Sequence, residues 1–327
     1  MNLKIYLDEY KYYLRNLNRI KMKRLSVVLL FCLLSFFNAC SSSSDQPNNR
    51  KKKLIATTGM VADMARNVLG DLVEVQVLMG PGVDPHLYKA SQGDMNLLAE
   101  ADIILYSGQH LEGKMVEVLH KIARTKPVLA VGDYVWENQL QRAGDGTQTI
   151  DPHLWMDPGV WLYGVHGVSD TLQHLFPNYS ARIGKNFRAY RDTLEKVKDE
   201  VYTSIQSIPA NQRVLITSHD AFRYFGLANN MEVRGLQGIS TVSEYGLQDV
   251  SNMVNLLVSR KIKAVFVESS VSQKSLQAVI EGCASKGHRV IIGGTLFSDS
   301  MGKSGTPEGT YKGMLRYNAN TIAKALR

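Results

Sequence analysis

Residues 180–208 read SARIGKNFRAYRDTLEKVKDEVYTSIQSI. Apolar side chains recur here at steps of three or four residues, namely Ile183, Phe187, Tyr190, Leu194, Val197, Val201 and Ile205. This spacing places them on one face of an α-helix, which Ser180 can cap and Pro209 ends. Such a helix is about 40 Å long, roughly the width of a domain. We therefore expect a long linker helix, residues 179–208, that packs along the body of the protein. The pattern is too short for a coiled-coil partner to be the better interpretation.

On both sides of this helix, short apolar runs alternate with amphipathic helical patterns. The expected strands are Leu54–Thr57, Val73–Leu78, Ile103–Tyr106, Val128–Val131, Val214–Thr217, Ile262–Val267 and Val290–Ile292. The expected helices are Met60–Leu69, Ser91–Ala99, Glu112–Ala123, Leu247–Ser259, Ser272–Lys286 and Tyr311–Leu326. Alternation of this kind favours parallel sheets covered by helices on both faces. The sequence thus predicts an α/β fold with two similar parallel-sheet lobes, residues 54–178 and 209–327, joined by the long helix.

The N-terminal residues are typical of a bacterial export signal. Basic residues precede an apolar run from Leu25 to Phe37, which is too short to span a bilayer and has the size of a signal-peptide core. The run ends in FNAC, so Cys40 resembles the cysteine that is lipidated in bacterial lipoproteins. We interpret residues 1–39 as a signal peptide, with an uncleaved membrane anchor as the alternative. Met22 fits the start of this signal, which would make residues 1–21 an upstream extension.

Residues 40–53 are polar and low in complexity, and we interpret them as a flexible tether between the lipid on Cys40 and the folded body.

Seven of the 38 Lys and Arg residues but only two of the 30 acidic residues lie in residues 1–39, so the remainder is only slightly basic. This balance gives no reason to expect a nucleic acid partner. The three cysteines form no Cys-x-x-Cys motif, which excludes a zinc ribbon and a dithiol redox site.

Four side chains stand out as candidate metal ligands. Asp-Pro-His occurs twice and supplies His86 and His153, TSHDAF supplies His219, and GTLFSD supplies Asp299. Three of the four follow a predicted strand, and ligands of open parallel sheets bind beyond the carboxyl ends of the strands. The prolines of the two Asp-Pro-His motifs stiffen the turns that present the histidines. We predict one metal site in the cleft between the lobes, with two ligands from each lobe.

Taken singly, each of these residues has a structural alternative, because His219 or Asp299 could simply cap a helix. Only the joint pattern indicates a metal, and we interpret the other five histidines as structural or solvated. Three imidazoles and a carboxylate suit Zn²⁺, with Mn²⁺ or Fe²⁺ as alternatives, whereas Ca²⁺ and Mg²⁺ prefer oxygen ligands. Four protein ligands leave no open position for a catalytic water, which favours capture of the ion over hydrolysis.

Two other functions are alternatives to capture of a metal ion. A secreted zinc hydrolase needs a general base and an open coordination site, and the chain has neither a His-Glu-x-x-His nor a Gly-x-Ser-x-Gly motif. An adhesin or interaction lipoprotein could use the same fold without transport, because a fold does not fix a function. We therefore expect a binding protein rather than an enzyme.

Seven motifs carry a family resemblance that spans Leu54 to Arg327. They are GPGVDPH (80–86), SGQHLEGKM (107–115), DPHLWMDP (151–158), TSHDAFRYFG (217–226), GISTVSEYG (238–246), FVESSVS (266–272) and FSDSMG (297–302). Together they resemble the metal-specific solute-binding proteins of bacterial ABC importers, the cluster A-I group with TroA-like, manganese-type and ZnuA-like members. The resemblance implies two α/β lobes joined by one rigid helix, and places the family's four ligands on His86, His153, His219 and Asp299.

The resemblance also bears on the metal and the partners. His219 stands where manganese-type members carry Glu, as in TroA-like and zinc-type members. Residues 137–150 contain no histidine, unlike the His-rich loop of many zinc-type members. The implied function is extracytoplasmic capture of one metal ion by a monomeric lipoprotein and delivery to an ABC permease. Asp157, Asp220 and Glu268 are candidates for orienting the imidazoles.

Overall fold

A computed structural model describes residues 50–144 and 147–327. The predicted signal peptide and Cys40 therefore lie outside the described residues. Lys51–Arg327 form one compact unit. Within the described ranges, none of the helices combines the length and the apolar character that a membrane span requires.

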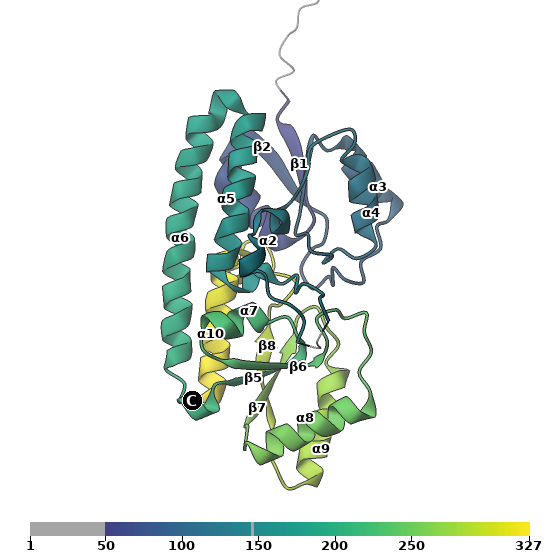
Figure 1. The fold of residues 1–327 in the computed structure, drawn as a ribbon, viewed down its shortest axis with the longest axis vertical. Helices are drawn as coiled ribbons and strands as arrows, with labels where there is room; N and C mark the ends of the chain where they lie inside the picture. The colour runs from purple at the N-terminus through teal and green to yellow at the C-terminus, as the bar shows by residue number, and fades with distance from the viewer. Residues whose placement is uncertain (1–49, 145–146) are drawn as a thin grey trace, which may run out of the picture. The chain divides into compact units, whose positions relative to one another are not determined.

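This unit contains two four-stranded sheets, both entirely parallel (Figure 1). The first has the order β2-β1-β3-β4, and the second has the order β6-β5-β7-β8. The strands of the first sheet are β1 (Lys52–Ala56), β2 (Val73–Val77), β3 (Ile103–Tyr106) and β4 (Val128–Ala130). Those of the second are β5 (Val214–His219), β6 (Glu232–Gln237), β7 (Ala264–Glu268) and β8 (Ile291–Leu296). The predicted two-lobe α/β architecture is confirmed.

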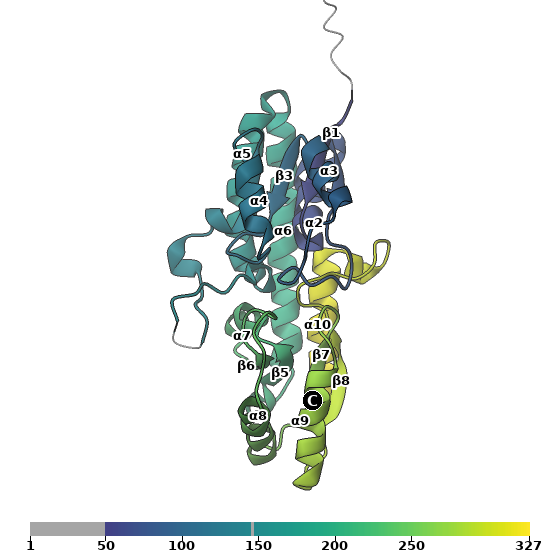
Figure 2. The same ribbon diagram turned by 90° about the vertical axis from the view of Figure 1, so that its right-hand side faces the viewer.

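Helices cover both faces of each sheet. The first lobe carries α2 (Gly59–Leu69), α3 (Gln92–Glu100), α4 (Met115–Ile122) and α5 (Pro158–Leu175). The second lobe carries α7 (Arg223–Ala228), α8 (Leu247–Ser259), α9 (Lys274–Ser285) and α10 (Tyr311–Leu326). The predicted long helix is α6 (Ser180–Gln206), which packs on α5 and α2 in the first lobe and on α10 in the second (Figures 1 and 2).

The apolar core explains why the lobes are tied together. Successive side chains of a strand point to opposite faces of a sheet, so Leu54 of β1 joins one core cluster while Ile55 joins another under α3 and α4. In β5, Leu215 belongs to the same large cluster as Leu54. The apolar face of α6, from Ile183 onward, belongs to it as well. One continuous core thus runs beneath α6 through both lobes, which resists wide separation of the two sheets.

The predicted start of one helix in the first lobe was wrong. The helix expected from Glu112 begins only at Met115, because Gln109, His110 and Gly113 adopt positive φ and keep residues 107–113 in a turn. The buried Glu112 carboxylate locks this turn by accepting the N–H groups of Ser107 and Gly108. It is therefore part of the loop rather than the helix.

The start of the long helix also differs from the expectation. Tyr179 occupies the N-cap position, and no side chain makes a capping hydrogen bond there. Ser180 is the first helical residue, and its hydroxyl faces Gln173 instead. The helix α5 and the strand β6 were not predicted at all, and β1 begins at Lys52, two residues before the expected strand.

Candidate metal centre

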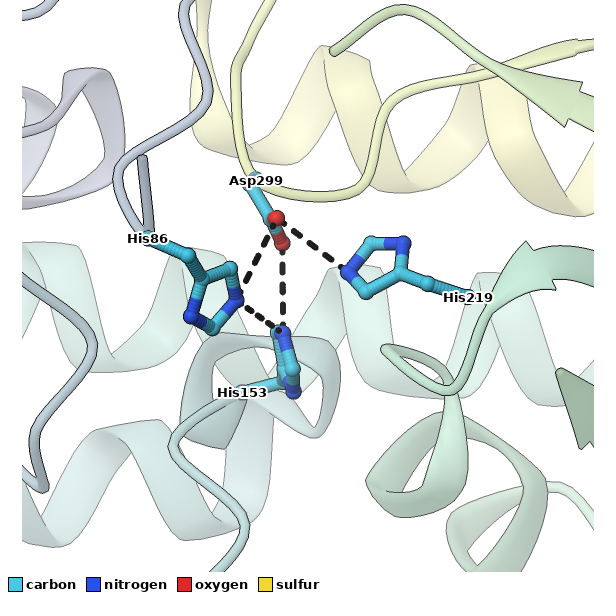
Figure 3. A group of neighbouring side chains, drawn as sticks. All are labelled: His86, His153, His219 and Asp299. Carbon is cyan, nitrogen blue, oxygen red and sulfur yellow. Dashed lines mark hydrogen bonds and ion pairs between the residues drawn. The ribbon is translucent and has the colours of Figure 1, made fainter. Parts of the chain in front are cut away.

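The structure brings together the four side chains that the sequence singled out. His86 lies in the loop after β2, His153 directly precedes a short 3₁₀ turn (Leu154–Met156), His219 ends β5, and Asp299 lies in the loop after β8. Their ligand atoms all lie within 4.8 Å of one another (Figure 3). All four side chains are buried, and the first lobe supplies two of them and the second lobe the other two. The site therefore forms only when both lobes are folded and in contact.

Asp299 lies at the centre of the group. Its Oδ1 is 3.3 Å from His153 Nε2, and its Oδ2 is 3.2 Å from His219 Nε2 and 3.6 Å from His86 Nε2. The Nε2 atoms of His86 and His153 are 3.4 Å apart. Three imidazole nitrogens and one carboxylate thus converge on a single point, which is the donor set and the number of ligands that a closed Zn²⁺ site uses.

The hydrogen bonding of the centre is incomplete without an ion. In the described part of the chain, both carboxylate oxygens of Asp299 and Nε2 of His219 are buried and have no hydrogen-bond partner of acceptable geometry. Leaving buried polar atoms unpaired is costly. A divalent cation would satisfy these atoms together, so the residues present fit a metal ion.

Two of the imidazoles are oriented by buried carboxylates. His153 Nδ1 is hydrogen-bonded to Asp151 Oδ1 at 2.7 Å. His219 Nδ1 lies in ion-pair contact with Glu268 Oε2 at 2.6 Å, although the two atoms are not aligned as a hydrogen bond. Glu268 also accepts the backbone N–H of His219 at 2.8 Å. A carboxylate at Nδ1 fixes the ring and its tautomer and leaves Nε2 free to bind a metal. Both rings consequently present Nε2 to the centre.

The two Asp-Pro-His motifs share a local geometry. In each motif the aspartate Oδ1 accepts the backbone N–H of the histidine two residues later, at 2.9 Å for Asp84 and His86 and at 3.0 Å for Asp151 and His153. Asp side chains commonly close turns in this way. The motif therefore fixes the backbone of the histidine, and in the second copy the same carboxylate also holds the ring.

Of the three carboxylates expected to orient imidazoles, one does so and the other two make different contacts. Glu268 does so, as described above. Asp157 instead caps α5 and accepts the N–H of Gly159 at 2.7 Å, while Asp220 pairs with Arg223 at 2.6 Å. The group that sequence reasoning missed is Asp151, and the signal was available in the repeated Asp-Pro-His motif.

The carboxylates and the burial set the protonation of the metal-free centre. Burial would lower the pKa of His153, but Asp151 and Asp299 outweigh it and raise this pKa to about 9. Burial likewise opposes the charged form of His219, yet Glu268 and Asp299 raise its pKa well above the usual value. For His86 burial dominates and lowers the pKa to about 4. At neutral pH the metal-free centre therefore holds protons on His153 and His219, which an incoming metal ion must displace.

The comparisons with known proteins place the chain in a family. Residues 54–325 match the family described as "ZnuA: Zinc-uptake complex component A periplasmic". The manganese-binding lipoprotein MntA of Bacillus subtilis is 52% identical over 272 residues, which cover 83% of this chain and 89% of that protein. The zinc-binding protein TroA of Treponema pallidum is 43% identical over 273 residues, covering 84% of this chain and 88% of that protein.

The fold agrees with this relationship. A solved structure of the periplasmic zinc-binding protein TroA from Treponema pallidum superposes with a TM-score of 0.82 at 42% identity, covering 85% of this chain and 99% of that chain. The relatives are named as binding proteins and not as enzymes. The chain is therefore a member of the ZnuA/TroA family of metal-binding solute-binding proteins of bacterial ABC transporters.

Proposed function

We propose that the chain captures one divalent transition metal ion with His86, His153, His219 and Asp299 outside the cytoplasm, and delivers it to an ABC permease. The observation that carries this proposal is the convergence of four buried ligand atoms, drawn from both lobes, on one point. Four protein ligands fill a tetrahedral coordination sphere. An ion held in this way has no open position for a reactive water, which suits binding and delivery.

The names of the relatives divide between two metals, because MntA is named for manganese and TroA for zinc. We propose that Zn²⁺ binds more tightly than Mn²⁺, with Fe²⁺ between them, on the chemistry of the donor set. Three of the four ligands are imidazole nitrogens, and the affinity of nitrogen and oxygen sites for divalent metals rises from Mn²⁺ through Fe²⁺ towards Cu²⁺ and Zn²⁺.

Competitive metal binding tests this proposal. Purified protein stripped of metal is titrated at neutral pH with Zn²⁺ and with Mn²⁺ against a chromophoric chelator. We expect one equivalent of either ion, and displacement of bound Mn²⁺ by an equimolar amount of Zn²⁺. Binding of less than one equivalent of both ions would refute the site, whereas displacement of Zn²⁺ by Mn²⁺ would refute only the proposed order.

We further propose that the protein is anchored to the membrane through a lipid on Cys40, in keeping with the relatives that are named lipoproteins. The short FNAC sequence after the apolar run supports this position. In cells that express the chain, a Cys40→Ser variant is expected to lose incorporation of labelled fatty acid and to leave the membrane fraction. Unchanged labelling of the variant would place the lipid on another residue, and absence of label from the native protein would exclude lipidation.

A further inference from the structure

His86 differs from the other three ligands of the centre. Its relative exposure is 7%, against 2% for Asp299 and 0% for His153 and His219. In the described part of the chain, its Nδ1 has no carboxylate within ion-pair distance, whereas Asp151 and Glu268 hold the other two rings. The position of His86 must therefore depend on the loop that carries it.

That loop, residues 78–91 between β2 and α3, is held from the opposite lobe next to His86. One oxygen of Asp84 accepts the backbone N–H of His86, and the other accepts the hydroxyl of Thr241 at 2.6 Å. Thr241 lies in the segment between β6 and α8, which rises towards the first lobe in Figure 1. A single carboxylate thus connects the backbone of a metal ligand in the first lobe with the second lobe.

A second contact with the opposite lobe lies two residues before Asp84. The backbone N–H of Gly82 donates to the hydroxyl of Ser300 at 3.0 Å, and Ser300 directly follows the ligand Asp299. Ser300 is kept in place by the Ser269 hydroxyl at 3.2 Å. Two hydroxyl groups of the second lobe therefore bracket the turn that carries His86.

The outer side of this loop is open at Gly80 and Gly82, whereas the carbonyl of His86 packs closely on Gly113. A Cβ added at Gly80 would meet nothing within 4 Å, and one at Gly82 would meet only a backbone oxygen at 3.5 Å. Leu87, next to His86, is 54% exposed. Two of the remaining ligands lack this freedom, since His219 ends a buried strand and His153 contacts the buried ring of Trp155. His86 can therefore withdraw with less disturbance of the core than His153 or His219.

We propose that the contacts Thr241–Asp84 and Ser300–Gly82 form an interlobe clasp that holds His86 on the ion, and that Thr241 is a positioning residue which sets the rate of metal release. This inference rests on the function proposed above. Opening of the clasp frees the turn at residues 80–86 and removes one of the four ligands while the shared core stays intact. A partner that pulls the segment between β6 and α8 away from Asp84 would thereby release the ion.

The test is the rate of metal release after mixing the loaded protein with excess chelator. A Thr241→Val variant keeps the shape of the side chain but cannot donate to Asp84. Because a hydrogen bond to a charged group stabilises the closed clasp, its loss is expected to increase the release rate about tenfold. Thr241→Ser keeps the hydroxyl and is expected to release metal as the native protein does. Thr193→Val, an exposed position on α6, is the matched control and is expected to have no effect.

A double-mutant cycle separates the clasp from a general loosening of the loop. In an Asp84→Ala background, adding Thr241→Val is expected to change the release rate little, because the acceptor is already absent. Native release by Thr241→Val, equal acceleration by Thr241→Ser, or full additivity with Asp84→Ala would each overturn the clasp. Stoichiometric binding by the native protein in the same experiment shows that the proposed function survives, whereas its absence removes both proposals.

Discussion

An Asp299→Asn protein is expected to bind Zn²⁺ at least about a hundredfold more weakly than the native protein. Asp299 is the only anionic residue among the four proposed ligands, and it lies within 3.6 Å of all three imidazole Nε2 atoms. The amide has nearly the same shape but no charge. Removing one member of a buried charge pair costs about 3–5 kcal/mol, and each ~1.4 kcal/mol is a factor of about ten in affinity.

The measurement is a chelator competition that reports the dissociation constant of each protein. Asp192→Asn makes the same chemical change at an exposed position on α6, where the carboxylate pairs only with Arg191 in the described structure. We expect this control to bind Zn²⁺ as the native protein does. If Asp299→Asn also retained native affinity, Asp299 would not be a ligand and the four-residue site would be wrong.

The second large effect is expected at Glu268, which is not one of the four proposed ligands. Its carboxylate lies 2.6 Å from His219 Nδ1 and also accepts the backbone N–H of that residue. In a Glu268→Gln variant the amide has no charge to stabilise the metal-bound imidazole, and its NH₂ group can face Nδ1 and favour the tautomer that carries the proton on Nε2. Loss of such a supporting group typically weakens metal binding by about 10–100-fold.

Asp220→Asn provides a matched control for this prediction. Asp220 directly follows His219, yet its carboxylate pairs with Arg223 and not with an imidazole. Zn²⁺ affinity should therefore fall in Glu268→Gln and stay close to native in Asp220→Asn. Equal losses in both variants would show that nearby charge, rather than contact with Nδ1, controls the site. No loss in Glu268→Gln would show that His219 needs no orienting partner.

The sequence predicted the four clustered residues and, apart from the edge strand β6, the two sheets, because these depend on local signals. Strands buried on both faces read as apolar runs, and alternation of strands and helices favours parallel pairing. The stiff Asp-Pro-His turns mark two of the histidines without any knowledge of the fold. His86, His219 and Asp299 come at or after the ends of strands, and their position at the carboxyl ends of the sheets follows from topology.

Other features could not be predicted because they depend on close approach. The helix α5 contains glycines where another side chain would clash, since a Cβ at Gly164 would lie 2.8 Å from the Val131 oxygen and one at Gly167 would lie 2.4 Å from the Tyr134 ring. Buried Trp161, Val165, Val168 and Leu172 still recur at helical spacing, so the sequence carried a signal for α5 that was missed. The close approaches at its glycines are what no local pattern marks. The contact between Asp84 and Thr241 joins residues that are 157 positions apart, and nothing local marks it.

The most direct test of the site is a crystal structure of the Zn²⁺-loaded protein with anomalous data at the zinc edge. We predict one strong peak between the lobes, at about 2.0–2.1 Å from Nε2 of His86, His153 and His219 and at about 2.0–2.2 Å from the Asp299 carboxylate. A peak at another position, or one from which any of these four side chains is absent, would contradict the assignment.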